Sequence, residues 1–273
     1  MQRIDIRGTM LNLKAVGNGP PLVLVHGLGG DHRSWEFVEP HLSERFRVIM
    51  PDLRCHGSSD CPEGMSMPSD YAADIAGLMS HLSIERAPVV GISMGGMVLL
   101  QMLLDFPRHV SAAVLVSTTP CVTEQLIDVV YSWREAQLQG GDEAYWWAST
   151  RDAFTESFIE DNPDLMDRLK RRFLEDARRF DVSSVLGFSS FDVVDRLGEI
   201  SVPVLIVHGS KDRIMDPAMA RMMNERIRGS RLVILEDCGH SPDVEQHERL
   251  ARLIADFILS VGQEGTGSDR PRE

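Results

Sequence analysis

The chain has 273 residues, 43% of them hydrophobic and 25% charged, and a formal net charge of −13. This length can bury one sizeable core, or one core with a modest insertion. The negative charge repels phosphate backbones and anionic lipid, so we expect neither nucleic acid nor a membrane as partner. No apolar run approaches the roughly 18 residues of a membrane span, and the N-terminus lacks the apolar core of a signal peptide. We therefore expect a cytoplasmic protein.

The predicted strands are short and largely apolar. Segments 2–6 and 10–16 flank Gly8 and predict a hairpin. The strands that follow are predicted at 22–26, 46–50, 87–90, 112–117, 202–208 and 231–235. Runs of this kind are typical of strands that are covered on both faces of a sheet.

Helices are predicted between these strands. Ser69 can cap a helix at 70–82, and Asp216 followed by Pro217 can cap and start one at 217–227. Further helical patterns cover 96–105 and 245–259. Alternating strands and helices predict an α/β fold with right-handed crossovers and a mostly parallel sheet flanked by helices.

One region breaks the alternation. Between residues 121 and 197 no strand is predicted, and helical patterns cover 124–139, 143–158 and 164–179. We expect a helical cap at 121–197, inserted in a core domain formed by 1–120 and 198–260. Segment 262–273 is Gly-rich and polar and has no apolar anchor, so we expect a disordered tail at 261–273.

The four cysteines, Cys55, Cys61, Cys121 and Cys238, show no CxxC spacing. A disulfide or a metal site is an open alternative, but in a reducing compartment we expect four unconnected thiols. We expect neither a metal nor an organic cofactor.

Ser93 is the candidate nucleophile. It stands in the G-x-S-x-G pattern Gly91-Ile92-Ser93-Met94-Gly95, after a predicted strand and before a predicted helix. Flanking glycines allow a strained turn that holds the serine oxygen up into a cleft. An ordinary Gly-rich turn is the alternative, but the strand and helix on either side favour the nucleophile.

A serine hydroxyl needs a base, and His240 is the candidate. It follows the last predicted strand, at the carboxyl edge of the sheet where ligands bind in open α/β folds. His26 and His208 each precede a glycine at a strand end and are interpreted as structural hydrogen-bonding groups. The histidines on predicted helices are interpreted as surface residues: His32, His41, His81, His109 and His247.

Asp212 is the candidate acid that orients the histidine, because it follows the strand at 202–208. Asp216 is a rival that is better explained as a helix cap, and Asp237 lies too close to His240 in sequence for a confident assignment. The order Ser93, Asp212, His240 is the one expected for a hydrolase of this topology.

Two backbone amides are candidates for stabilising an oxyanion. The N–H of Met94 directly follows the nucleophile at a helix start, where the helix dipole adds positive charge. The N–H of Leu28 lies in the Gly-rich loop 26–30 after the first central strand, where glycines let the backbone approach a substrate.

These motifs together resemble the α/β-hydrolase superfamily over nearly the whole chain. They are His26-Gly27-Leu28-Gly29-Gly30, Asp52-Leu53-Arg54-Cys55-His56-Gly57-Ser58-Ser59, Gly91 to Gly96, Gly209-Ser210-Lys211-Asp212 and Gly239-His240. The resemblance is to the branch of small carboxylesterases, enol-lactone hydrolases, carbon–carbon bond hydrolases and cofactor-free perhydrolases. It implies a helical cap between the sixth and seventh strands.

Departures from the family patterns argue against some of the activities found in the superfamily. Haloalkane dehalogenases and epoxide hydrolases use an aspartate nucleophile, which Ser93 argues against. Ring-cleavage carbon–carbon hydrolases commonly carry asparagine and tryptophan where this chain has Ile92 and Ser241. Cys55 stands where such loops usually carry glycine. The tryptophans of the cap, Trp133, Trp146 and Trp147, either wall the acyl pocket or pack the cap onto the core.

We therefore expect hydrolysis of a small carboxylic ester or lactone through an acyl-enzyme. One alternative is a catabolic enol-lactone or carbon–carbon bond hydrolase of aromatic degradation. Another, outside the enzymes, is a small-molecule sensor that retains the triad. The sequence leaves the natural substrate and the oligomeric state open, with a monomer and a homodimer both plausible.

Overall fold

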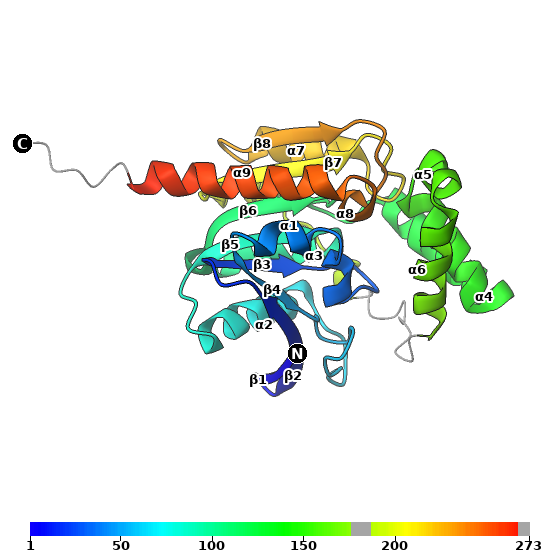
Figure 1. Ribbon diagram of the computed structural model, residues 1–273, viewed down its shortest axis with the longest axis horizontal. Coiled ribbons are helices and arrows are strands. Elements are labelled where there is room, and N and C mark those ends of the chain that lie inside the picture. Colours follow the sequence, from blue (N-terminus) through cyan, green and yellow to red (C-terminus); the bar gives the residue numbers. More distant parts are fainter. Residues whose placement is uncertain (176–186, 267–273) are drawn as a thin grey trace, which may run out of the picture.

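The computed structural model describes residues 1–175 and 187–266. Its centre is an eight-stranded sheet in the order β1-β2-β4-β3-β5-β6-β7-β8 (Figure 1). The strands are β1 (Gln2–Ile6), β2 (Thr9–Val16), β3 (Pro21–Val25), β4 (Arg47–Pro51), β5 (Ala87–Ile92), β6 (Val110–Val116), β7 (Val204–Gly209) and β8 (Arg231–Leu235). Strand β2 pairs antiparallel with β1 and β4, and the remaining pairs are parallel. The predicted α/β fold with a mostly parallel sheet is confirmed.

Helices cover both faces of the sheet, which explains why the central strands are apolar throughout. Helices α2 (Pro68–His81), α3 (Met94–Asp105) and α7 (Pro217–Arg226) contribute to the core on one face. Helices α1 (Glu39–Ser43) and α9 (His247–Thr266) contribute to the core on the other. Short helices complete the described core: η1 (His32–Trp35), η2 (Pro107–His109), η4 (Val194–Glu199) and α8 (Pro242–Glu245).

Three α-helices lie between β6 and η4 in the described part of the chain, and Figure 1 shows them grouped beside one end of the sheet: α4 (Glu124–Ala153), α5 (Glu156–Asp161) and α6 (Pro163–Glu175). Helix α4 is interrupted at Gly141, where φ is +72°, between the predicted helices 124–139 and 143–158. The predicted helix 143–158 is divided, because Thr155 caps α5 by accepting a hydrogen bond from the amide of Phe158. Residues 176–186 of the expected cap, and with them the end of the predicted helix 164–179, lie outside the described residues.

Two helix ends differ from the prediction. Helix α2 begins at Pro68, and the carboxylate of Asp70, not the side chain of Ser69, accepts a backbone hydrogen bond there, from the amide of Met67 at 2.9 Å. Helix α9 continues to Thr266, past the end expected at residue 259. Val261, the first residue of the expected tail, packs against the hydrophobic core, and residues 261–266 are helical instead of disordered. The rest of the expected tail, 267–273, lies outside the described residues.

The expectation of four free thiols is wrong for two of them. Cys55 and Cys61 form a disulfide in the loop after β4, whereas Cys121 and Cys238 are free. The loop folds back on itself, with Cys55 at a φ of +62° and its amide donating to the carbonyl of Asp60 at 3.0 Å. This places the two Cα atoms 4.1 Å apart, a proximity that spacing alone does not reveal.

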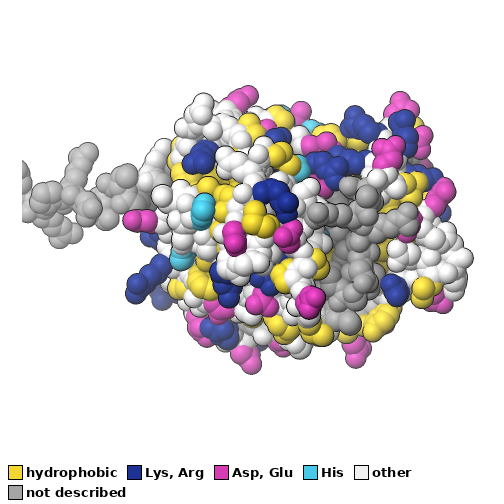
Figure 2. Space-filling view, turned by 90° about the horizontal axis from the view of Figure 1, so that it is seen from below, with side chains coloured by type: hydrophobic (Ala, Val, Ile, Leu, Met, Phe, Trp, Pro, Cys, Tyr) yellow, Lys and Arg dark blue, Asp and Glu magenta, His cyan; other side chains and the backbone are white. Residues whose placement is uncertain are grey.

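The surface carries charge of both signs. On the face in Figure 2, acidic and basic side chains are interspersed among hydrophobic ones. Within residues 1–175 and 187–266, none of the helices has the length and apolar character needed to cross a membrane.

Candidate active site

Ser93 occupies a sharp turn between β5 and α3. Its backbone has φ +55° and ψ −123°, a region that costs a non-glycine residue about 1–3 kcal/mol. A Cβ on Gly91 would lie 2.3 Å from the carbonyl oxygen of Gly95, and one on Gly95 would lie 2.3 Å from that of Val25. Both positions therefore require glycine, which explains the G-x-S-x-G spacing.

The turn is held from the neighbouring strand. The amide of Ser93 donates to the carbonyl of Val116 at the end of β6, at 2.9 Å, and its carbonyl accepts from the Thr118 hydroxyl at 2.8 Å. These contacts fix the orientation of the serine. Sequence reasoning did not single out Thr118, because nothing in its local pattern indicates a partner 25 residues away.

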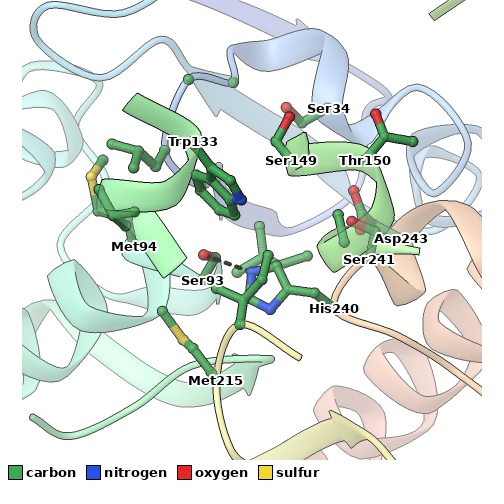
Figure 3. Close-up of a pocket in the computed structure, with 18 of the residues that line it drawn as sticks. Ser34, Ser93, Met94, Trp133, Ser149, Thr150, Met215, His240, Ser241 and Asp243 are labelled. Carbon is green, nitrogen blue, oxygen red and sulfur yellow. Dashed lines mark hydrogen bonds between the residues drawn. The ribbon is translucent and has the colours of Figure 1, made fainter. Parts of the chain in front are cut away.

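The three predicted side chains meet at the carboxyl edge of the sheet. His240 Nε2 lies 2.9 Å from Ser93 Oγ, and its Nδ1 lies 2.8 Å from Asp212 Oδ2 (Figure 3 shows the first contact). Both His240 and Asp212 are 7% exposed. Asp216 instead caps α7, accepting from the amide of Ala218 at 2.8 Å.

Asp212 is held as a carboxylate by several donors. Its Oδ1 accepts the amides of Ile214 and Met215, each at 2.9 Å. Its Oδ2 also lies 3.1 Å from Nε2 of His208, which contacts the carbonyl of Met215. Burial alone raises the pKa of Asp212, but the charge of His240 and the hydrogen bonds from both histidines together lower it well below its usual range.

The pKa of His240 shifts in the opposite direction. Burial lowers it, but the charge of Asp212 and the hydrogen bond to that carboxylate raise it by more, so the net pKa lies above its ordinary value. A base with a raised pKa accepts a proton more readily, as removal of a serine proton requires.

The loop that carries His240 is anchored to the helices between β6 and β7. The carbonyl of Ala153, at the end of α4, accepts the amides of His240 at 2.9 Å and Ser241 at 3.2 Å. Glu245 accepts the amide of Gly239 at 2.9 Å and the hydroxyl of Thr155 at 2.7 Å. The histidine is therefore positioned jointly by the sheet and by these helices.

The loop after β3 approaches the serine closely. A Cβ on Gly27 would lie 3.1 Å from the Cβ of Ser93. His26 braces this loop: its Nε2 accepts the amide of Leu53 at 3.0 Å, which leaves Nδ1 to donate to the carbonyl of Gly27 at 2.7 Å. Burial lowers the pKa of His26, consistent with this neutral form. His26 and His208 both have the structural hydrogen bonds predicted for them.

Leu28 and Met94, whose backbone amides are the candidate oxyanion donors, border the same space. Both residues line the pocket that contains Ser93. Met94 is the first residue of α3, where the amide has no partner within the helix. Within the described residues, neither amide donates a hydrogen bond to a protein group.

Ser93 and His240 open into a cavity of about 470 Å³, a volume in the range of small-molecule sites. Trp133 and Trp146 from α4 are part of its wall, whereas Trp147 lies against Lys170 of α6 with the ammonium 5.4 Å from the ring centre. Two of the three tryptophans therefore shape the pocket.

One acidic and histidine cluster near this loop has the spacing of metal ligands: Asp31, His32 and Asp52. Its side chains already have partners. His32 Nδ1 lies 2.7 Å from Asp52 Oδ1, and Asp31 pairs with Arg33. The cluster braces the loop that carries Leu28.

Comparisons with known proteins show which family the chain resembles. Residues 20–245 match a family model described as the alpha/beta hydrolase fold. The chain is 30% identical to 3-oxoadipate enol-lactonase 2 of Acinetobacter baylyi, over 86% of this chain and 87% of the relative. It is 29% identical to 2-hydroxy-6-oxo-2,4-heptadienoate hydrolase of Pseudomonas putida, over 93% and 94%. Among solved structures, a thermophilic esterase from Thermogutta terrifontis superposes with a TM-score of 0.85 at 27% identity, covering 96% of this chain and 99% of the esterase.

Proposed function

Because the chain belongs to the α/β-hydrolase family, we propose that it is a serine hydrolase that cleaves a small carboxylic ester or lactone through an acyl-enzyme. The hydrogen-bonded chain from Ser93 through His240 to Asp212 carries this proposal. The enol-lactonase and esterase among its relatives support the substrate class.

In the acylation step, Ser93 Oγ attacks the substrate carbonyl carbon while His240 Nε2 takes its proton. The C–O bond to the alcohol then breaks, and the alcohol leaves with the proton from His240. Asp212 holds the imidazole in the tautomer with Nδ1–H and stabilises its charged form. Water then attacks the acyl-enzyme with His240 again as base, and the acid and free Ser93 are released.

The tetrahedral intermediate places negative charge on the former carbonyl oxygen. We assign its stabilisation to the amides of Leu28 and Met94, which border the pocket beside Ser93. Helices α4 to α6 act in this proposal as a cap that limits the space for the acyl group and excludes water.

Carbon–carbon bond hydrolysis is the second candidate, favoured by the Pseudomonas putida relative. Ile92 and Ser241 disfavour it, because they replace the residues that such enzymes commonly have beside the nucleophile and the histidine. Turnover of a vinylogous diketone acid, compared with an aryl ester, separates the two activities.

The cytoplasmic location remains a prediction. The Cys55–Cys61 disulfide counts against it, because structural disulfides are typical of oxidising compartments.

Replacement of Ser93 tests its role as the proposed nucleophile. We expect Ser93→Ala to lower kcat/KM for p-nitrophenyl acetate by about 10³-fold or more, since the attacking oxygen is lost. Ser69→Ala, an exposed serine of α2, is the matched control and is expected to keep full activity. A fluorophosphonate probe should label Ser93 in the wild type and no serine in Ser93→Ala.

Near-full activity of Ser93→Ala would reject the mechanism. If Ser93 is acylated once and the acyl group is not released, so that there is no multiple turnover, the alternative of a small-molecule sensor would be favoured over an enzyme.

A further inference from the structure

One side of the cavity carries polar groups that the mechanism above does not use. Ser34 of η1, Thr150 of α4 and Ser241 of the histidine loop line it together with Asp243. Within the part of the chain that the structure describes, the hydroxyls of Ser34, Thr150 and Ser241 have no hydrogen-bond partner. In Figure 3, Ser34, Thr150 and Asp243 lie on one side of the pocket, and Met94 and Trp133 on the other.

Asp243 is the unusual member of this polar side. It lies in α8 and is 7% exposed, yet its Oδ1 has no hydrogen-bond partner among the described residues. Burial of a carboxylate oxygen that has no hydrogen-bond partner disfavours the ionised form. Burial raises the pKa of Asp243 to about 7, although its own amide and the charge of His240 act in the opposite direction.

The catalytic contacts do not account for this carboxyl. His240 uses its two ring nitrogens for Ser93 and Asp212, at 2.9 and 2.8 Å, so neither is left for Asp243. With a pKa of about 7, a large fraction of this carboxyl is protonated at pH 7, and the protonated form offers an O–H donor at the cavity wall.

We propose that Asp243 is a specificity-determining residue, whose carboxyl donates a hydrogen bond to an uncharged acceptor, a ketone or amide carbonyl, on the ester or lactone substrate. This inference rests on the proposed hydrolase function and specifies its substrate class. An alkyl group at the same place would leave the carboxyl and the nearby hydroxyls without partners. Sites built to hydrogen-bond a substrate reject analogues that lack the polar group for this reason.

Matched substrate pairs test the proposal. In the acyl series, p-nitrophenyl alkanoates are compared with oxoalkanoates of equal length that carry the ketone at the fourth, fifth or sixth carbon. In the alcohol series, acetates of alkanols are compared with acetates of hydroxyketones. The readout is the ratio of kcat/KM between the members of a pair at pH 7, corrected for uncatalysed hydrolysis.

We expect the wild type to prefer the ketone in at least one pair by about 3- to 10-fold, the effect of one neutral hydrogen bond. Asp243→Leu should reduce this ratio to about one, and Asp243→Asn should restore it, because the amide also donates. Asp195→Leu, at a fully exposed side chain of η4, is the control and should keep the wild-type ratio. If the Asp243→Leu protein does not fold, Asp243→Ala is measured in its place.

The absence of any ketone preference in the wild type, or its persistence in Asp243→Leu or Asp243→Ala, would overturn the assignment of Asp243. In either case Ser93-dependent hydrolysis of the plain esters would leave the proposed function standing. Failure to hydrolyse any ester would reject both.

Discussion

Single residues at this site are held in conformations that only their surroundings stabilise. Ser93 keeps a φ of +55° because its amide and carbonyl are bound by Val116 and Thr118. The contact of His240 Nδ1 with the carboxylate of Asp212 favours the Nδ1–H tautomer and orients the ring. The strained serine and the oriented imidazole are thereby aligned before a substrate arrives.

The raised pKa of His240 predicts the position of the acidic limb of activity. Only the neutral imidazole accepts a proton, so kcat/KM falls as pH drops through this pKa. Because Asp212 raises the pKa above its ordinary value of 6.5, we expect the midpoint above pH 6.5. A profile of kcat/KM from pH 5 to 9 measures it, and a midpoint below 6.5 would contradict the electrostatic role of Asp212.

Substitution of the two candidate acids separates their roles. We expect Asp212→Asn to lower kcat by about 10³- to 10⁴-fold, because asparagine favours the wrong imidazole tautomer. Asp216→Asn should change kcat little, since asparagine also caps a helix. Steady-state kinetics give kcat for both variants. A larger loss of kcat in Asp216→Asn than in Asp212→Asn would assign the acid to position 216.

Among the elements, the loop after β4 is cross-linked to its surroundings by several contacts. Arg54 makes two hydrogen bonds of 2.7 Å to Asp74 of α2, and the Cys55–Cys61 disulfide closes the loop beside them. Asp52 of the same loop accepts the backbone amide of His32, at 2.8 Å. The loop therefore links α2 to the segment that carries Leu28.

Loss of the disulfide should lower stability more than activity. We expect Cys61→Ser to reduce the free energy of unfolding by about 2 kcal/mol, as the short cross-link constrains the unfolded chain. Urea unfolding measures this, with Cys121→Ser as the free-thiol control. Alkylation without reductant followed by mass spectrometry should leave Cys55 and Cys61 unmodified, and labelling of both would show that the bond is absent.

In the whole molecule, helices α4 to α6 contact the rest of the chain around the cavity. Arg172 of α6 pairs with Glu36, which follows η1, at 2.8 Å, and the guanidinium of Arg168 lies 5.9 Å from the ring centre of Phe37. The carbonyl of Ala153 in α4 accepts hydrogen bonds from the amides of His240 and Ser241. Helices α4 and α6 are therefore bound to the rest of the chain both at η1 and at the histidine loop.

This arrangement predicts a preference for short acyl chains. A cavity of about 470 Å³ beneath α4 and α6 has room for a small substrate, whereas lipases acting on droplets expose a broad apolar surface. We expect kcat/KM for p-nitrophenyl esters to peak at short chains and to fall toward palmitate. A maximum at palmitate would indicate that the cap opens into a lipase-like site.

The sequence by itself determined the strand order along the chain, the turn at Ser93 and the positions of Asp212 and His240. Each of these depends on a local signal: an apolar run, a glycine pair that permits a close turn, or a polar residue directly after a strand. In a parallel sheet the carboxyl strand ends share one edge, so local signals at several strand ends predict one site.

The tertiary structure decided what depends on contacts between distant segments. The Cys55–Cys61 bond requires the loop to fold back, and the extension of α9 past residue 259 depends on a core that packs against Val261. Asp243 reads in the sequence as an ordinary acidic residue after a proline, and only the helices around it bury its carboxyl beside the cavity. Burial and pairing are properties of the surroundings, which a linear pattern does not contain.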